Sequence, residues 1–152
     1  MKKKETNFVI TQLGKNDVTL AGKLIAMFNE VFEEKKTAAV KKAHLQNILN
    51  NPAFIALVAL DGNTVIGGIT AYELPMLSSE KPEIFIYDVA IKSEYQRKGI
   101  GRKLMAALLA LGKEKGVSEI FVAAHTADNH ALKFYRSLGG KAEKVNMFVF
   151  GG

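Results

Sequence analysis

Three consecutive segments of strand-forming residues occupy the middle of this 152-residue chain and constrain its fold more than any other feature. The first, residues 54–60, is wholly apolar, and Asp61-Gly62-Asn63 separates it by a short turn from the second, residues 64–73. The third, residues 83–91, is rich in β-branched and aromatic side chains. Because short turns join antiparallel neighbours, we expect these segments to form the centre of a sheet.

Helical patterns precede and follow these strands. Apolar residues recur at helical spacing in four segments, which are residues 20–32, 40–49, 100–115 and 131–138. Shorter strand-like runs occur at residues 8–13, 119–124 and 142–150. The chain therefore predicts an α/β (α+β) fold in the order β-α-α-β-β-β-α-β-α-β, with a single mixed, mostly antiparallel central sheet flanked by helices. Its length suits one domain over residues 1–152.

The composition excludes several chemistries and environments. The chain has no cysteine, which removes disulfides, thiolate metal ligands and a cysteine nucleophile. The basic start, Met1-Lys2-Lys3-Lys4-Glu5, lacks the apolar run and cleavage site of a signal peptide. The sequence also has no apolar stretch long enough to span a bilayer. We therefore expect a cytoplasmic protein without a membrane partner.

Positive and negative residues are segregated along the chain, whose formal net charge is +6. Residues 51–95 contain two Lys against six Asp and Glu, a net charge of −4. Residues 96–152 contain ten Lys and Arg against four acidic residues, a net charge of +6. Either exposed charges cluster by chance, or two parts of one site bind ligands of opposite charge.

The sequence Gln96-Arg97-Lys98-Gly99-Ile100-Gly101 follows the third central strand and directly precedes a helix. Two glycines two residues apart let the backbone turn tightly and approach a ligand without a Cβ in the way. The helix start leaves N–H groups unpaired at the positive end of its dipole, which favours an anion. Arg97, Lys98, Arg102 and Lys103 add four cationic side chains. Together these features predict a site for a pyrophosphate.

Two other phosphate-binding motifs do not fit this turn. The dinucleotide fingerprint requires G-x-G-x-x-G, but position 104 is Leu, and the P-loop spacing G-x-x-x-x-G-K-[ST] is absent. A plain glycine-rich turn with solvated lysines is the structural alternative. The position between a strand and a helix, with four flanking cations, favours the phosphate site over that alternative.

Two motifs together resemble the GNAT superfamily of acetyltransferases. Gln96-x-x-Gly99-x-Gly101, after the strand that ends Asp88-Val89-Ala90-Ile91, looks like the acetyl-CoA motif of that superfamily. The run NHALKFYRSLG at residues 129–139 is similar to its second motif. Stretches at residues 54–57, 71–75 and 83–90 are similar to the aminoglycoside 3-N-acetyltransferases. The resemblance implies a GNAT fold and an acetyl-CoA-dependent N-acetyltransferase acting on a primary amine, specifically the 3-amino group of an aminoglycoside antibiotic.

The resemblance places acetyl-CoA, as co-substrate, against the strand end, the glycine-rich turn and the last helix. The residues implied are Val89, Ala90, Ile91, Gln96, Arg97, Lys98, Gly99, Ile100, Gly101, Arg102 and Asn129. In the family this strand parts from the next strand and leaves main-chain groups for the pantetheine arm, so the Val89 N–H is the candidate oxyanion donor. Tyr135 matches the tyrosine credited with protonating the leaving thiolate. As structural alternatives, Asn129 could cap the last helix and Tyr135 could pack its ring.

A carboxylate is expected to take a proton from the attacking amine, and Glu83 and Asp88 are the candidates. Their separation of five positions puts them on opposite faces of a regular strand, unless a bulge near Asp88 changes the alternation. Asp88 lies inside an apolar strand, where an unpaired carboxylate is costly, which favours it for binding or activating an amine. A buried hydrogen-bonding role is its structural alternative. Tyr87 and Glu73 are expected to line the acceptor side.

Other functions remain as alternatives. The acceptor could be a polyamine, a metabolite amine or a protein amine, and a non-catalytic CoA- or nucleic-acid-binding module forms a second class. Nucleic-acid binding requires basic side chains interleaved with aromatics, whereas the aromatics here occupy mostly apolar positions, so we expect no nucleic-acid partner. His44, His125 and His130 show no metal-binding spacing, so no metal is expected. The family is often dimeric, which makes a homodimer one option.

Overall fold

The computed structural model describes residues 7–33 and 39–151. The chain divides into two compact units, Met1–Val122 and Ala123–Gly152, and each is described by itself. The first unit contains the whole sheet and three of the α-helices. The second contains one α-helix and the C-terminal segment.

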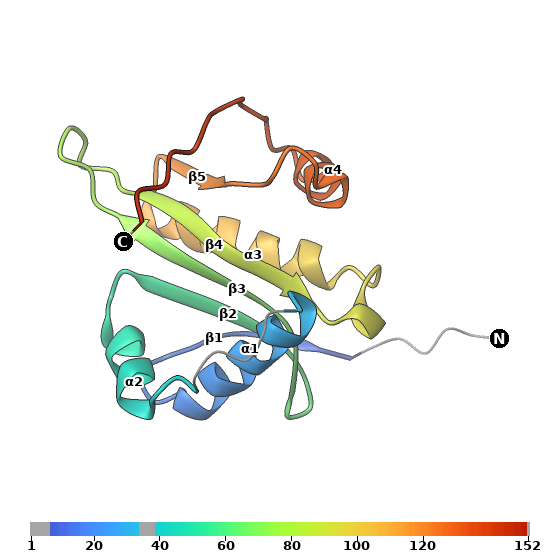
Figure 1. Ribbon diagram of the computed structural model, residues 1–152. Coiled ribbons are helices and arrows are strands. Elements are labelled where there is room, and N and C mark those ends of the chain that lie inside the picture. The colour runs from blue at the N-terminus through green and yellow to red at the C-terminus, as the bar shows by residue number, and fades with distance from the viewer. Residues whose placement is uncertain (1–6, 34–38, 152) are drawn as a thin grey trace. The chain divides into compact units, whose positions relative to one another are not determined.

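The sheet has five strands in the order β1-β2-β3-β4-β5 (Figure 1). They are β1 (Val9–Gln12), β2 (Phe54–Asp61), β3 (Thr64–Leu74), β4 (Glu83–Ile91) and β5 (Glu119–Val122). The first four pair antiparallel with their neighbours, and β5 pairs parallel to β4. The predicted mixed, mostly antiparallel sheet is confirmed.

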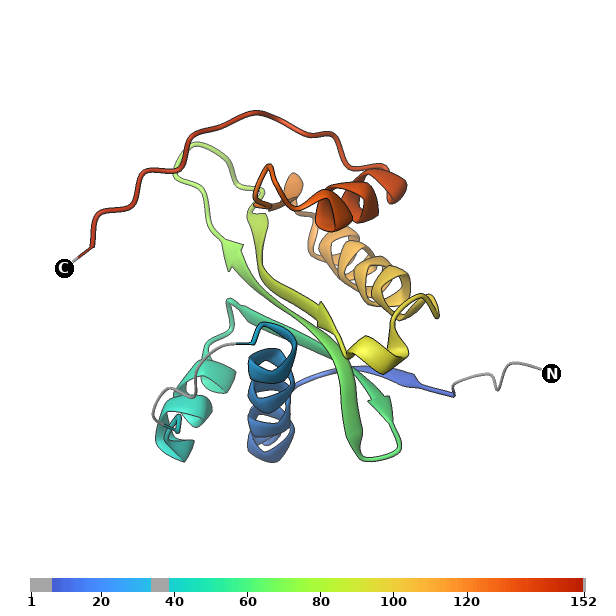
Figure 2. The ribbon, with the colours of Figure 1, turned by 45° about the vertical axis from the view of Figure 1, so that its right-hand side comes forward.

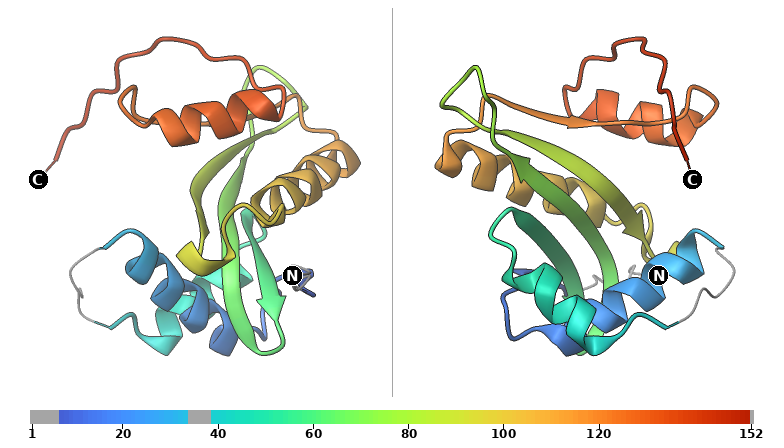
Figure 3. Two further views of the ribbon diagram at one scale, coloured as in Figure 1. Left: turned by 90° about the vertical axis from the view of Figure 1, so that its right-hand side faces the viewer. Right: turned by 60° about the vertical axis from the view of Figure 1, so that its left-hand side comes forward.

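Helices of the first unit cover both faces of this sheet (Figures 2 and 3). The helices α1 (Val18–Val31) and α2 (Lys42–Asn50) lie on one face, and α3 (Ile100–Lys115) lies on the other. Apolar residues at spacings of three and four give α1 and α3 a buried stripe, whereas Leu45 and Leu49 of α2 are only partly buried against the core. The stripe of α1 includes Leu24, Met27 and Phe28, and that of α3 includes Ile100, Leu104 and Leu108.

A β-bulge interrupts the pairing of β3 with β4. Thr70 pairs with Asp88, but the next residue, Ala71, pairs with Ile86, so Tyr87 is an extra residue on β4. One extra residue reverses the alternation of side chains that follow it. Asp88 therefore lies on the same face as Phe85, toward α1 and α2, instead of the face of the fully buried Ile86. Of the two arrangements that the sequence left open for Glu83 and Asp88, the structure therefore has the one with a bulge.

The second unit contains α4 (Asn129–Ser137). Asp128 is its N-cap, because the Asp128 Oδ1 atom accepts a hydrogen bond of 3.0 Å from the Ala131 N–H. Asn129, which the sequence offered as a possible cap, is instead the first residue of the helix.

The predicted last strand, residues 142–150, is wrong. None of the described residues after α4 belongs to a strand, and the segment is irregular up to residue 151. The β-branched and aromatic side chains of this segment favour an extended backbone, but a strand also requires a partner for its ladder of hydrogen bonds. Propensity alone does not specify that partner. The observed order is β-α-α-β-β-β-α-β-α.

Across residues 7–33 and 39–151, no helix has the length and apolar character needed to cross a membrane.

Candidate active site

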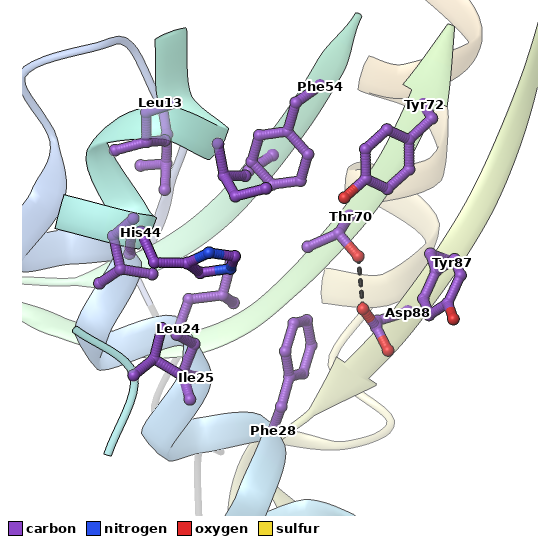
Figure 4. A pocket seen from close by; sticks show the side chains of 16 residues that line it. Leu13, Leu24, Ile25, Phe28, His44, Phe54, Thr70, Tyr72, Tyr87 and Asp88 are labelled. Carbon is purple, nitrogen blue, oxygen red and sulfur yellow. Dashed lines mark hydrogen bonds between the residues drawn. The ribbon is translucent and has the colours of Figure 1, made fainter. Parts of the chain in front are cut away.

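A cavity of about 300 Å³ lies between α1, α2 and the sheet face that they cover (Figure 4). Much of its wall is apolar, including Leu13, Leu24, Phe28 and Phe54. Its polar lining residues are His44, Thr70, Tyr72, Tyr87 and Asp88. A largely apolar cavity with a few convergent polar groups is the usual form of a small-molecule site.

Asp88 supplies the carboxylate of this cavity. The Thr70 Oγ1 atom donates a hydrogen bond of 2.5 Å to the Asp88 Oδ2 atom, across the paired strands β3 and β4 (Figure 4). Thr70 is only 9% exposed, so its hydroxyl is fixed by the surrounding sheet. No other hydrogen bond to this carboxylate is formed within the described residues, which leaves the Oδ1 atom able to accept one from a ligand. Asp88 is thus both hydrogen-bonded and open to the cavity.

Two tyrosines border the carboxylate. Burial raises the pKa of the Tyr72 hydroxyl above its usual 10.0. Electrostatic repulsion from Asp88, and to a smaller extent from Tyr87, raises this pKa further. Tyr72 is therefore a neutral hydroxyl group at physiological pH. Tyr87, which the bulge adds to β4, is 68% exposed while also lining the cavity. Tyr87 thus borders the cavity, and its predicted contact with an acceptor stays a prediction.

Glu83 and Glu73 do not line the cavity. Glu83 shares a face of β4 with Asp88, but it lies at the start of the strand, in register with Glu119 of β5. Glu73 follows Tyr72 on β3 and so faces the opposite side of the sheet. There its Oε2 atom lies 3.2 Å from the Lys115 Nζ atom of α3. The prediction that Glu73 lines the acceptor side is therefore wrong.

The glycine-rich turn leads from β4 through a short 3₁₀ helix, η1 (Ser93–Tyr95), into α3. Gly99 is the N-cap of α3 and has a φ of +81°, in the left-handed region that glycine adopts most easily. A Cβ built on Gly99 would meet no atom within 4 Å, so the space beside it is open. The N–H groups of Ile100 and Gly101 precede the first helical bond, which Lys103 donates to the Gly99 carbonyl oxygen.

Two residues of this turn, Arg97 and Gly99, have a positive φ. Arg97 has a φ of +61°, so left-handed residues flank Lys98 on both sides. Such a conformation costs a non-glycine residue on the order of 1 kcal/mol and is found where a site requires it. Gln96 ties the turn to β4, because its Nε2 atom donates a 3.2 Å hydrogen bond to the Ile91 carbonyl oxygen. The Ile100 side chain is buried, so only its main chain can contact a ligand.

β5 pairs along its whole length, but only with the first part of β4. Their register runs from Glu83 with Glu119 to Ile86 with Val122, whereas the residues from Asp88 to Ile91 pair only with β3. No described strand follows the β5 side of β4 beyond that point. Because β5 ends at Val122, the main chain of Val89, Ala90 and Ile91 has no described strand neighbour on that side. The contact of these residues with the pantetheine arm stays a prediction.

Tyr135 and Asn129 belong to α4 in the second unit. Burial raises the pKa of the Tyr135 hydroxyl above 10.0, and the Asp128 charge adds to the rise. The Tyr135 ring packs against that of Phe134, with centroids 5.4 Å apart. Asn129 does not cap α4, since Asp128 does. The roles of both residues toward acetyl-CoA stay predictions.

Sequence reasoning missed Thr70, Tyr72 and His44 as lining residues. Alternation along β3 places Thr70 and Tyr72 on one face, but only the register with β4 sets Thr70 opposite Asp88. His44 reaches the cavity wall from α2 (Figure 4). Within the part of the chain that the structure describes, no group of three His, Asp or Glu side chains is placed to hold a metal ion.

The family to which the chain is matched, and the similar solved structures described below, are those of acetyltransferases. Residues 22–139 match the Acetyltransferase (GNAT) family, so the chain belongs to that family, and the prediction from the two motifs is confirmed. GNAT acetyltransferases use acetyl-CoA. The matched range includes the cavity lining from Leu24 onward, the glycine-rich turn and α4.

Two crystal structures of an aminoglycoside acetyltransferase from an uncultured soil metagenomic sample are similar to this chain over 95% of both chains. The complex with trehalose has 41% sequence identity and a TM-score of 0.92, and the complex with sisomicin has 40% identity and the same TM-score. Thialysine N-epsilon-acetyltransferase of Bos taurus is 30% identical over 73 residues, which are 45% of this chain and 43% of that protein. The match thus spans less than half the length of this curated relative.

Proposed function

We propose that the protein transfers the acetyl group of acetyl-CoA to a primary amine that enters the cavity beside Asp88. The observation that carries this proposal is the Asp88 carboxylate, held by Thr70 in a largely apolar cavity, on the strand whose end leads into the glycine-rich turn. One strand thus connects a proton acceptor for a cationic amine with a site for an anionic phosphate group. This arrangement agrees with the segregation of charge along the sequence.

Asp88 receives the proton of the acceptor. An alkylammonium has a pKa of about 10.4, so at neutral pH the amine must lose a proton before its nitrogen can attack. The Asp88 Oδ1 atom accepts that proton directly or through one water molecule. Thr70 orients the carboxylate by holding its Oδ2 atom, and the neutral Tyr72 hydroxyl adds a polar contact for the acceptor.

Acetyl-CoA supplies the activated acetyl group as a co-substrate. The amine nitrogen forms a bond to the acetyl carbon, and the bond from that carbon to sulfur breaks. The Val89 N–H donates to the carbonyl oxygen as negative charge develops on it, and Tyr135 gives a proton to the departing thiolate. The raised pKa of Tyr135 keeps that proton available at neutral pH. No protein nucleophile is needed, in keeping with a chain that lacks cysteine.

The glycine-rich turn fits the pyrophosphate of acetyl-CoA. The open space beside Gly99, the positive φ of Arg97 and the start of α3, where main-chain N–H groups lack helical partners, support this assignment. Gln96, Arg97, Lys98, Gly99, Ile100, Gly101 and Arg102 would hold this group, with Ile100 and the glycines contributing only main-chain atoms. Val89, Ala90, Ile91 and Asn129 would hold the pantetheine arm.

We further propose that the acceptor is an aminoglycoside and that its 3-amino group is acetylated. Identities of 41% and 40% over 95% of the chain to two structures of one aminoglycoside acetyltransferase, one of them a complex with sisomicin, support the acceptor class. The 3-amino position is supported by the likeness of residues 54–57, 71–75 and 83–90 to the aminoglycoside 3-N-acetyltransferases. The product of sisomicin, examined by NMR, would show which amine carries the acetyl group.

The direct test is acetyl-CoA turnover by the wild type and two carboxylate variants. Asp88→Asn removes the proton acceptor and should lower kcat/KM for sisomicin by roughly 100- to 10,000-fold. Glu114→Gln, a matched change at an exposed carboxylate on α3, should leave kcat/KM within about twofold of the wild type. Full activity of Asp88→Asn would contradict the proposed proton transfer.

An amino-acid, polyamine or protein amine is the second candidate acceptor. The names of curated relatives support it, since one is a thialysine N-epsilon-acetyltransferase and another, of Escherichia coli strain K12, is a ribosomal protein bS18-alanine N-acetyltransferase. The same assay with spermidine, lysine and a short peptide decides between the classes. Turnover of these amines without turnover of sisomicin or gentamicin would overturn the aminoglycoside assignment while keeping the acetyltransferase reaction.

A further inference from the structure

A row of aromatic residues crosses the sheet on the face that carries the cavity. Phe54 of β2 pairs with Tyr72 of β3, Tyr72 pairs with Phe85 of β4, and Phe85 pairs with Phe121 of β5. The ring of Tyr87, the bulge residue, contacts those of Tyr72 and Phe85, with centroids 6.3 Å and 5.9 Å away. These five residues, called the aromatic row below, reach over four neighbouring strands.

The aromatic row continues beyond the cavity. Phe54, Tyr72 and Tyr87 line the cavity, but Phe85 and Phe121 do not. The rings of Phe85 and Phe121 stack with centroids 5.0 Å apart, and this pair is displaced from Tyr72 by one to two strand spacings, up to roughly 10 Å. Cross-strand aromatic pairs stabilise a sheet, but Tyr87 is 68% and Phe121 39% exposed. Part of the row therefore offers ring surface to a ligand.

Two carboxylates lie beside the outer pair of rings. Glu83 and Glu119 are register partners, each two residues before Phe85 or Phe121, so they share the face of those rings. Like charges directly opposite one another on neighbouring strands are unfavourable. Neither carboxylate has an ion-pair partner within residues 7–33 and 39–151. A cationic group of a ligand would relieve this repulsion.

We propose that Phe85, Phe121, Glu83 and Glu119 form a distal acceptor subsite, which binds an ammonium-bearing ring of an acceptor whose other ring presents its amine to Asp88. The ring surface of Tyr87 connects this subsite to the cavity. Aromatic faces attract ammonium groups and cover the apolar face of a saturated ring, and the two carboxylates pair with further ammonium groups. The proposal rests on the proposed acetyl transfer and defines the acceptor as a polyamine built of linked rings. It also gives Glu83 a binding role in place of proton transfer.

The test compares acceptors that do and do not reach the distal subsite. Sisomicin has three linked rings, whereas 2-deoxystreptamine is a single ring with two amines. Phe121→Leu and Glu119→Gln should each raise the KM for sisomicin about two- to fivefold, which corresponds to about 0.5–1 kcal/mol. The same variants should change the KM for 2-deoxystreptamine at least threefold less. Calorimetry of sisomicin binding should show a matching loss of affinity, independently of turnover.

Matched controls separate a lost subsite from a damaged fold. Leu109→Ala and Glu114→Gln change an exposed apolar side chain and an exposed carboxylate on α3, away from the aromatic row, and should leave both acceptors unaffected. Phe121→Tyr keeps the ring and should retain the KM for sisomicin. An unchanged KM for sisomicin in Phe121→Leu and Glu119→Gln, or an equal loss for both acceptors, overturns the subsite. Absence of any aminoglycoside turnover by the wild type overturns the proposed function instead, and sisomicin calorimetry still decides on the subsite.

Discussion

Thr70 of β3 and Asp88 of β4 are register partners, and the Thr70 hydroxyl donates a hydrogen bond of 2.5 Å to the Asp88 carboxylate. A hydrogen bond to a charged group contributes about 1.5–3 kcal/mol. Thr70→Val keeps the shape of the side chain and removes the donor. We therefore expect kcat/KM for the acceptor to fall by roughly ten- to a hundredfold, while the KM for acetyl-CoA is unchanged. Steady-state kinetics with each substrate varied in turn would measure both.

The conservative variant Thr70→Ser tests whether the hydroxyl or the packing matters. Serine retains the donor and loses one methyl group, so it should recover most of the activity that valine loses. Its melting temperature should fall slightly, because the methyl group lies in a buried part of the sheet. If Thr70→Ser is as inactive as Thr70→Val, Thr70 serves packing and does not position Asp88.

Gly99 and Gly116 stand at opposite ends of α3 in the same left-handed conformation, with φ values of +81° and +70°. A Cβ added at either glycine would meet no atom within 4 Å, so alanine would cause no clash there. The left-handed backbone conformation alone should then cost alanine about 1–2 kcal/mol at either position. Only Gly99 lies at the helix end that attracts an anion. We expect Gly99→Ala to weaken acetyl-CoA binding about tenfold and Gly116→Ala to leave it unchanged, as measured by calorimetry. Equal affinities in the two variants would exclude the proposed phosphate site.

The sequence was most informative where the signal is local. The turn at Asp61-Gly62-Asn63, the strand-to-helix position of Gly99 and the end of α3 at Gly116 all depend on residues close together in the chain, and all three are as predicted. Features that depend on pairing between distant segments were harder to predict from the sequence. The spacing of Glu83 and Asp88 left open whether β4 is regular or has a bulge. The bulge at Tyr87 follows from the register of β3 with β4, which the loop between these strands does not reveal.

The predictions that proved wrong or incomplete also concern features that depend on pairing between distant segments. Alternation alone does not say which face of β3 meets α1, so Glu73 was expected beside the acceptor although it contacts Lys115 of α3. The hydrogen bond between Thr70 and Asp88 is another consequence of strand register, and the local sequence pattern does not predict it. The last segment has strand-forming residues, yet residues 142–150 have no strand pairing, because propensity does not supply a partner.

Tyr72 reports on the charge of Asp88. Burial and then the Asp88 charge raise the pKa of Tyr72 above 10.0, so Asp88→Asn should lower that pKa. The unfolded chain ionises Tyr72 at its ordinary pKa, before the folded protein does, so folding stability falls as pH rises above about 10. The fall due to Tyr72 should be smaller in Asp88→Asn. Ultraviolet titration of phenolate formation, with Tyr72→Phe as the reference that removes the signal, measures the change, and an identical titration in both proteins would contradict it.

The raised pKa of the Tyr135 hydroxyl should be visible in the pH dependence of catalysis. Its hydroxyl is the proposed proton donor to the thiolate, and burial, then the Asp128 charge, keeps it protonated to higher pH than an ordinary phenol. Tyr135→Phe should lower kcat by roughly 100- to 10,000-fold at neutral pH. Because a raised pKa retains the acid form, the ratio of wild-type to variant kcat should stay constant up to about pH 10 and decline only above it. Kinetics of both enzymes across that range, with acetyl-CoA saturating, measure the ratio. A ratio near one throughout would leave Tyr135 as a packing residue of α4, and a decline that begins well below pH 10 would assign the titration to another group.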